Sequence, residues 1–175
     1  NPAILLSGQV NDEMYANFRS QLAAAPGTGL MSLELSTLGG DPEIARMIGE
    51  DVRFHSQVEP DRRFVFLGKA AVYSAGVTLK SFFHRSNRYL TRGTRLMIHE
   101  RKLDENLKLH GPLTSVAAVA RAKLAQIEAS ITIQNEGFAN LVAGSRVDCH
   151  RRRARALQLV PGRHRGAGTW AEAII

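Results

Sequence analysis

The sequence predicts an α/β fold with a largely parallel β-sheet, flanking helices and one long protruding helix. Short apolar segments of strand length alternate with segments whose apolar residues recur every three or four positions. Glycine-rich turns follow several of the strand candidates. Such alternation is typical of parallel sheets whose strands are joined by helices. In these sheets the functional groups gather at the carboxyl ends of the strands.

The first part of the chain contains three strand candidates with a helix in each interval. The strands are expected over Ala3–Leu6, Leu30–Leu35 and Arg63–Leu67. The first helix is expected over Asp12–Ala25, and its apolar face consists of Met14, Phe18 and Leu22. The second helix begins at Asp41-Pro42-Glu43, which supplies an N-cap, a proline at the first helical position and a first-turn acid. Its apolar face is expected to hold Ile44, Met47, Ile48 and Val52.

The second part of the chain leads into a single long helical pattern. A helix is expected over Ala75–His84, followed by short strands at Arg88–Leu90 and Arg95–Ile98. Residues Thr114–Val142 are then expected to form one long helix with Gly144 as its C′ residue. About 28 residues at 1.5 Å per residue span ~42 Å, more than a domain of this size needs for its own core. The surplus length predicts a subunit interface and a homo-oligomer.

Composition limits the class of protein. The chain has 175 residues, of which 44% are hydrophobic and 22% charged, typical of a globular protein with a sizeable core. No apolar run is long enough for a transmembrane helix, and no secretory signal is recognisable, so no membrane partner is expected. The single cysteine, Cys149, excludes an internal disulfide and a cysteine-rich zinc site. A cytoplasmic location is the default expectation.

The positive charge is concentrated in the tail. Residues 1–144 carry 16 Lys and Arg against 14 Asp and Glu, whereas residues 145–175 carry seven Arg against two acids. We therefore divide the chain into a domain at 1–145 and an atypical Arg-rich tail at 146–175. The tail is open to three interpretations: a basic arm, a solvated disordered segment, or the product of a frame shift. Nucleic-acid binding is not favoured, because only Trp170 supplies an aromatic ring nearby.

Ser74 is the candidate nucleophile. It lies in Val72-Tyr73-Ser74-Ala75-Gly76, between a predicted strand and a predicted helix, and keeps the second half of the G-x-S-x-G nucleophile elbow. Free backbone N–H groups at a helix N-terminus favour negative charge that develops on such a serine. The alternative is that Ser74 is only the N-cap of the helix.

Two further groups are expected at neighbouring strand ends. His99 follows the strand Arg95–Ile98, and its pKa range suits proton transfer from a serine hydroxyl. Gly39-Gly40 precedes a capped helix and offers backbone N–H groups for an oxyanion hole, together with the N–H of Ala75. The alternatives are a strand-end histidine bonded to the backbone and an ordinary glycine turn.

Chain order restricts the kind of triad. Residues 75–98 contain no Asp or Glu, so the order Ser–acid–His is excluded. The order His–Asp–Ser would need His55 and Asp61, both within 20 residues of Ser74 in one linker. The order that remains is Ser–His–acid, with the acid beyond His99.

At this point the sequence resembles the Clp-type serine peptidases, the proteolytic subunits of the Clp protease, within the ClpP/crotonase fold. The resemblance runs from about Ile4 to Gly144. It rests on three blocks with matching order and spacing, namely Ser36-Thr37-Leu38-Gly39-Gly40, Gly68 through Gly76, and Leu96-Met97-Ile98-His99. The long helix after His99 is similar to the handle helix of that family, through which two rings face each other.

The resemblance implies a serine-type peptidase that forms an acyl-enzyme. Ser74 would be the nucleophile, His99 the general base and acid, and the N–H groups of Gly40 and Ala75 the oxyanion hole. The substrate would be a peptide or unfolded protein, and the assembly a homo-oligomeric ring or stacked double ring. No metal or cofactor is implied. An ATPase partner belongs to the family pattern, and nothing in the sequence points to one.

The sequence also departs from the family pattern. Glu100-Arg101 follows the histidine where the family commonly has Gln-Pro, and Arg151-Arg152-Arg153 stands where its acid is expected. Asp148 is the candidate triad acid, as the only acid between Glu136 and Glu172. Two alternatives stay open. One is a weak or inactive ring subunit of the same fold. The other is a crotonase-like acyl-CoA enzyme, which needs no serine–histidine pair at these positions.

Overall fold

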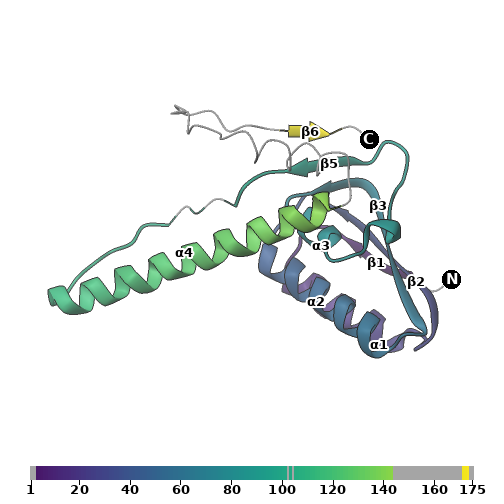
Figure 1. Cartoon of the computed structure of the whole chain (residues 1–175), viewed down its shortest axis with the longest axis horizontal. Helices are drawn as coiled ribbons and strands as arrows, with labels where there is room; N and C mark the ends of the chain where they lie inside the picture. The colour runs from purple at the N-terminus through teal and green to yellow at the C-terminus, as the bar shows by residue number, and fades with distance from the viewer. Residues whose placement is uncertain (1–2, 102, 104, 144–170, 174–175) are drawn as a thin grey trace.

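The computed structural model describes residues 3–101, 103, 105–143 and 171–173, and it is an α/β structure built on a mostly parallel sheet (Figure 1). The strand order along the sheet is β1-β2-β3-β5-β6, with β4 paired to β3 beside this path. Every described pairing is parallel except that of β5 with β6. The strands are β1 (Ala3–Ser7), β2 (Gly29–Thr37), β3 (Arg62–Tyr73), β4 (Arg88–Leu90), β5 (Arg95–Ile98) and β6 (Ala171–Ala173).

The first two helices, α1 (Asp12–Ala24) and α2 (Pro42–Val58), cross between successive parallel strands. They lie side by side, and Asp51 on α2 accepts hydrogen bonds from Tyr15 and Arg19 on α1. Sequential strand order with right-handed crossovers puts both helices on one face of the sheet, as Figure 1 shows. Alternate residues of β2 are buried beneath them, namely Met31, Leu33, Leu35 and Thr37.

The helix starts follow the sequence prediction, and the buried face of α2 differs from it in one residue. The Asn11 side chain caps α1, and the Asp41 side chain caps α2 by accepting from the Glu43 N–H at 2.7 Å. Met47, expected on the buried face of α2, is 42% exposed instead. Gly49 is buried on the other side of Ile48, where a Cβ would lie 2.3 Å from the Phe82 ring.

Strand β3 is longer than predicted because it is irregular. It pairs with β4 through residues 66–68 and with β5 through residues 71–73. Between these two segments Ala70 has φ 57°, and the register against β2 shifts between Leu35 and Thr37. An extra-residue irregularity of this kind interrupts the alternation by which strands are recognised in sequence. Helix α3 (Ala75–Ser81) is in turn shorter than expected, since Phe83 turns into the core.

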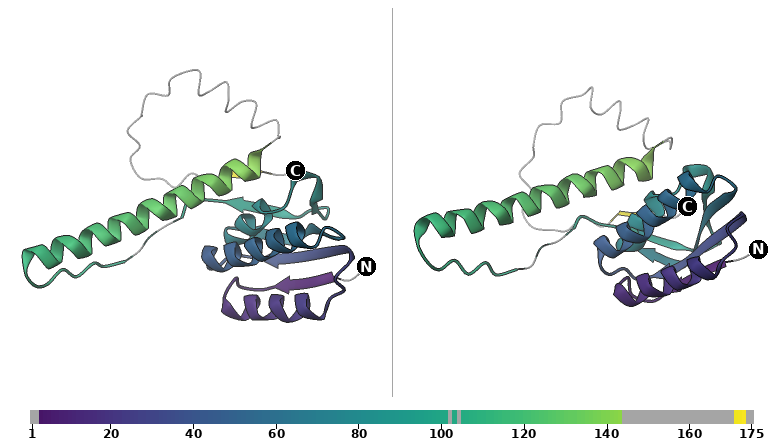
Figure 2. Two further views of the ribbon diagram at one scale, coloured as in Figure 1. Left: turned by 60° about the horizontal axis from the view of Figure 1, so that its bottom comes forward. Right: turned by 90° about the horizontal axis from the view of Figure 1, so that it is seen from below.

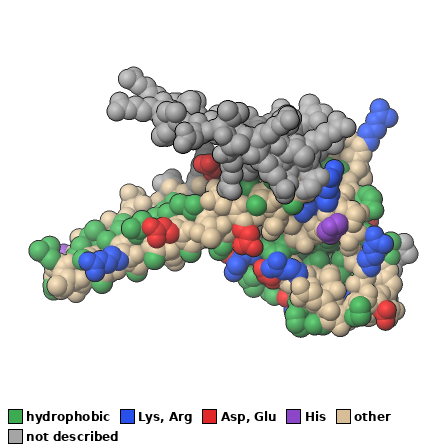
Figure 3. Space-filling model, viewed as in Figure 1, with side chains coloured by type: hydrophobic (Ala, Val, Ile, Leu, Met, Phe, Trp, Pro, Cys, Tyr) green, Lys and Arg blue, Asp and Glu red, His purple; other side chains and the backbone are tan. Residues whose placement is uncertain are grey.

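Helix α4 (Leu113–Val142) confirms the long helical pattern, and at 30 residues it extends, together with the segment that precedes it, well beyond the sheet and the other helices (Figures 1 and 2). None of its residues is buried. Hydrophobic side chains are visible along much of its length (Figure 3). Despite its length, no helix in the described part of the chain is both long and apolar enough to cross a membrane.

The C-terminal part of α4 contacts the domain. Arg88 at the start of β4 donates hydrogen bonds to carbonyl oxygens at the ends of two helices. Two acceptors belong to α4 and its last turn, Asn140 and Leu141, at 3.0 Å each. The other two follow or end α3, Ser81 at 3.1 Å and Phe83 at 2.7 Å. Of the tail at 146–175, the structure describes only β6, which pairs antiparallel with β5.

Candidate active site at the carboxyl end of the sheet

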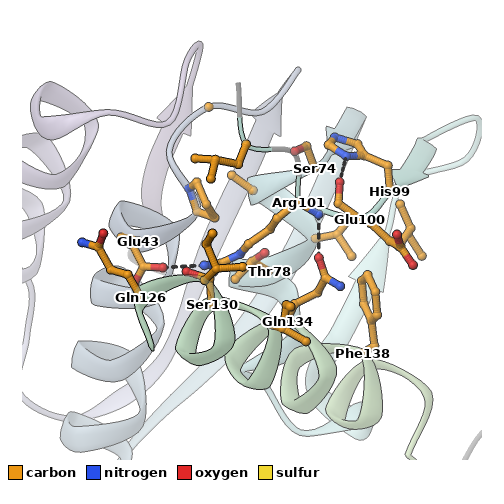
Figure 4. Close-up of a pocket in the computed structure, with 18 of the residues that line it drawn as sticks. Glu43, Ser74, Thr78, His99, Glu100, Arg101, Gln126, Ser130, Gln134 and Phe138 are labelled. Atoms are coloured by element: carbon orange, nitrogen blue, oxygen red, sulfur yellow. Dashed lines mark hydrogen bonds and ion pairs between the residues drawn. The ribbon is translucent and has the colours of Figure 1, made fainter. Parts of the chain in front are cut away.

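The predicted site residues come together around one cavity. Three adjacent strands, β2, β3 and β5, end on the same edge of the sheet, and each is followed by one of the predicted groups. Gly40 follows β2, Ser74 follows β3 and His99 follows β5, so Ser74 occupies the middle position. All three line a cavity of about 730 Å³, whose opposite wall is formed by α4 (Figure 4).

Ser74 lies at a sharp turn between β3 and α3 with φ 51° and ψ −114°. Few non-glycine residues adopt this backbone region, and such strain concentrates at functional sites. It is also typical of the serine in a nucleophile elbow. Ser74 occupies the N-cap position of α3, and its side chain makes no capping hydrogen bond to the helix.

The backbone fixes Ser74 relative to the strand that carries His99. The Ser74 N–H donates to the Met97 carbonyl oxygen at 2.9 Å, which continues the parallel ladder in which Tyr73 pairs with Met97. His99 lies only two residues beyond Met97. The serine and the histidine are therefore at the ends of neighbouring hydrogen-bonded strands, and both side chains lie at the same end of the cavity (Figure 4).

The contact of His99 with Glu100 determines the tautomer of the imidazole. Nδ1 of His99 lies 2.7 Å from the backbone oxygen of Glu100. Because a carbonyl oxygen can only accept, Nδ1 carries the proton in this contact. The lone pair of a neutral ring is then on Nε2, as a general base for a serine hydroxyl requires. The Glu100 carbonyl thus engages the nitrogen that a triad acid would engage.

The Gly39-Gly40 turn approaches Ser74 closely. Both glycines have positive φ, 111° and 146°. A Cβ on Gly39 would lie 2.9 Å from the Ser74 Cβ, and a Cβ on Gly40 would lie 2.2 Å from the Val10 oxygen. Thr37, which is buried, holds the turn by accepting from the Gly39 N–H at 3.0 Å.

The neighbouring backbone donors of this turn have acceptors, whereas the N–H groups of two residues that line the cavity have none among the described residues. Val10 N–H donates to Gly39, and Asp41 N–H donates to Val10. Among the described residues, no hydrogen bond uses the N–H of Gly40 or that of Ala75, the first residue of α3. Orphaned N–H groups at a glycine turn and a helix N-terminus form the kind of donor pair that stabilises an oxyanion.

The sequence did not identify three residues that shape this site. They are Thr37, which holds the glycine turn, and Arg101 and Gln134, which line the cavity wall. Thr37 two residues before the first glycine was a usable signal, because a Thr hydroxyl commonly bonds the backbone two residues further on. Nothing in the sequence pairs Arg101 with its partners, which lie 58 and 33 residues away.

Asp148, the predicted triad acid, lies outside the described residues, so its role stays a prediction. In the described part of the chain, no group of three or more His, Cys, Asp or Glu side chains is arranged to hold a metal ion. Burial lowers the pKa of Lys80 on α3, and neighbouring Arg88 lowers it further. Lys80 does not line the cavity.

No protein-family model matches this sequence, and a search of curated proteins finds no significant match. The class of this protein is therefore described by its fold and its candidate site. The chain is an α/β protein with a mostly parallel sheet, whose strand ends gather a serine, a histidine and two backbone N–H groups without acceptors among the described residues around one cavity.

Proposed function

We propose that this chain is a serine peptidase of Clp type, with the ClpP/crotonase fold, that hydrolyses peptide bonds through an acyl-enzyme. One observation carries the proposal. Ser74 has the backbone strain of a nucleophile elbow and makes no side-chain capping bond. It shares one cavity with His99 and with the N–H groups of Gly40 and Ala75, which have no acceptors among the described residues. An N-cap serine in a regular helix start would need none of these features.

In the proposed reaction, Ser74, His99 and the two backbone N–H groups each have one role. Ser74 Oγ attacks the scissile carbonyl carbon while His99 Nε2 takes its proton. The carbonyl oxygen becomes an oxyanion and accepts from the N–H groups of Gly40 and Ala75. Collapse of the tetrahedral intermediate breaks the C–N bond, and His99 returns the proton to the leaving amine. Water then attacks the acyl-enzyme by the same path, releasing the acid and restoring Ser74.

The proposal includes a homo-oligomeric ring. Exposed apolar side chains on α4 support it, among them Leu113 at 85%, Leu124 at 55% and Ile131 at 50% exposure. A monomer has no use for so much exposed apolar surface on a helix that leaves the domain. The substrate would be a peptide or an unfolded protein. We propose no ATPase partner, because no feature of the described surface supports one.

The test is labelling by a fluorophosphonate probe, which reacts with an activated serine. The parent chain should be labelled and should hydrolyse small fluorogenic peptides. Ser74→Ala should lose both activities, by roughly 10⁴–10⁶ in rate, with an unchanged circular dichroism spectrum. Ser115→Ala, which changes an exposed serine on α4, is the matched control and should behave as the parent. Equal hydrolysis by the parent and Ser74→Ala would refute the proposal.

The role of Asp148 has a separate test. If Asp148 holds Nδ1 of His99, Asp148→Asn should lower kcat by roughly 10²–10⁴ with little change in KM. Unchanged kinetics would show that the Glu100 carbonyl orients the imidazole without help from this acid. A parent and an Asp148→Asn variant that are equally slow would instead favour a weak or inactive ring subunit.

A further inference from the structure

One ion pair connects the two outer segments of the candidate site. Arg101 lies two residues beyond His99, and Glu43 lies three residues beyond Gly40. Their side chains meet with the guanidinium Nη1 2.6 Å from the carboxylate Oε1, and both residues line the cavity (Figure 4). The segment that carries the predicted base is thereby joined to the segment that carries the predicted oxyanion hole.

The sheet order shows why such a connection matters. The oxyanion turn follows β2 and the histidine follows β5, and β3 separates these two strands. Neighbouring strands are about 4.8 Å apart, so the outer two are about 10 Å apart and share no ladder hydrogen bonds. Each outer segment touches Ser74 at the end of β3, through the Gly39 contact and the Met97 hydrogen bond. Among the described residues, the ion pair connects the two outer segments directly.

Both partners are held in place by other contacts. The Arg101 N–H donates to the Gln134 Oε1 on α4 at 2.5 Å, and the Arg101 side chain is only 21% exposed. Glu43 is in the first turn of α2, whose start is capped by Asp41, and its second oxygen pairs with Arg46. An arginine held at its backbone N–H and bonded through its guanidinium to a carboxylate on another element restricts the distance between the two segments.

The energy scale separates a positioning role from a stabilising one. A partly exposed ion pair contributes only about 0–1 kcal/mol to folding stability. A shift of about 1 Å in a catalytic group, however, can cost on the order of 10² in rate. Removal of this ion pair should therefore affect catalysis far more than the free energy of unfolding.

We propose that Glu43 and Arg101 form a positioning clamp that fixes the distance between the Gly40 N–H and His99 across the nucleophile strand. This inference rests on the proposed peptidase function and adds two positioning residues to it. Neither side chain is required to touch the reacting atoms. The pair acts by keeping the oxyanion donor and the base in register with Ser74 at the same time.

The kinetic test is a double-mutant cycle of Glu43→Gln and Arg101→Gln. Each single variant should lower kcat by roughly 10- to 100-fold at nearly constant KM, with an unchanged melting temperature. The double variant should be no slower than the slower single variant, because the second change removes nothing further. Arg101→Lys keeps the charge and should recover part of the rate. Glu50→Gln, which breaks a separate ion pair of α2 with Arg53, is the matched control and should leave kcat unchanged.

A second measurement separates failure of the clamp from failure of the peptidase proposal. Arg101→Gln should raise the hydrogen-exchange rate of the Asp41 amide, which donates to Val10 beside the oxyanion turn, by roughly tenfold. Activity in the parent with unchanged kcat in both single variants would overturn the clamp alone. If the parent proves inactive, the peptidase proposal fails, and exchange at Asp41 decides the clamp. Unchanged exchange there overturns it.

Discussion

Gly40 shows most directly how a single residue limits the chemistry of the site. Its φ of 146° is open to glycine and strained for other residues, and the Val10 oxygen fills the space where a side chain would begin. The same backbone leaves the Gly40 N–H without an acceptor among the described residues. The backbone conformation that only glycine adopts easily is therefore the same conformation that leaves the Gly40 N–H available as a donor.

We expect Gly40→Ala to disrupt both. The added Cβ would lie 2.2 Å from backbone, so the turn must move, at a cost of about 2 kcal/mol or more in the free energy of unfolding. Urea unfolding measures that cost, and fluorophosphonate labelling of Ser74 should be lost with it. Gly27→Ala is the control, because a Cβ at Gly27 has no neighbour within 4 Å. A Gly40→Ala variant with parental stability would contradict the close approach to Val10.

Lys80 provides a prediction that depends on pH. It is only 8% exposed, and burial together with Arg88 lowers its pKa below the ordinary 10.5. Between the lowered folded pKa and 10.5, the unfolded chain binds more protons, so stability rises with pH through that window. Below the folded pKa the full cost of burying the ammonium group is present. Lys80→Met should therefore stabilise the protein at pH 7, by on the order of 1 kcal/mol.

Urea unfolding of the parent and Lys80→Met at two pH values measures this effect. The advantage of the variant should shrink as the pH rises towards 10.5 and beyond, because the parent lysine is neutral in both states only above that pH. An advantage that is independent of pH would mean that packing, not charge, is responsible. A variant less stable than the parent at both pH values would contradict the assigned cause.

At the scale of elements, Arg88 anchors one end of α4. Its guanidinium donates to four carbonyl oxygens at the ends of α3 and α4, where the helix dipoles favour a cation. Arg88→Met would leave these carbonyls without their donor, and we expect a loss of about 3 kcal/mol in the free energy of unfolding. Arg92→Gln, an exposed arginine of the same segment, should change stability little. Equal stability of the two variants would refute the anchor.

The elements were predictable to the extent that local patterns determine them. Regular periodicity predicted the helices at 12–24 and 113–142 within two residues, because their apolar faces repeat without interruption. The second half of β3 was not predicted, because the irregularity at Ala70 breaks the alternation of its side chains. The positions of Ser74 and His99 beyond strands were predicted from the strand and helix patterns around them in the sequence. The Arg101–Glu43 contact did not, because it depends on which strands are neighbours in space.

At the scale of the whole molecule, the exposed apolar surface of α4 predicts self-association. Leu124→Glu places a charge on this surface outside the cavity lining and should dissociate the assembly without unfolding the chain. Light scattering should then change from a multiple of 19.2 kDa to the monomer mass. Val58→Glu at the end of α2, where Val58 is 54% exposed, is the control and should stay assembled. A parent chain that is already monomeric at micromolar concentration would contradict the prediction.

The attachment of α4 near one end has a mechanical consequence. The far tip of the helix lies about 42 Å from the Arg88 anchor, so a rotation of about 10° around this anchor would move the tip by about 7 Å. The same rotation would move Gln134, about 10 Å from the anchor, by only about 2 Å. Leverage of this ratio converts a large displacement at the tip into a small, graded change in the width of the cavity. A force applied to the far tip of α4 would thus change the width of the cavity by only a small fraction of the displacement at the tip.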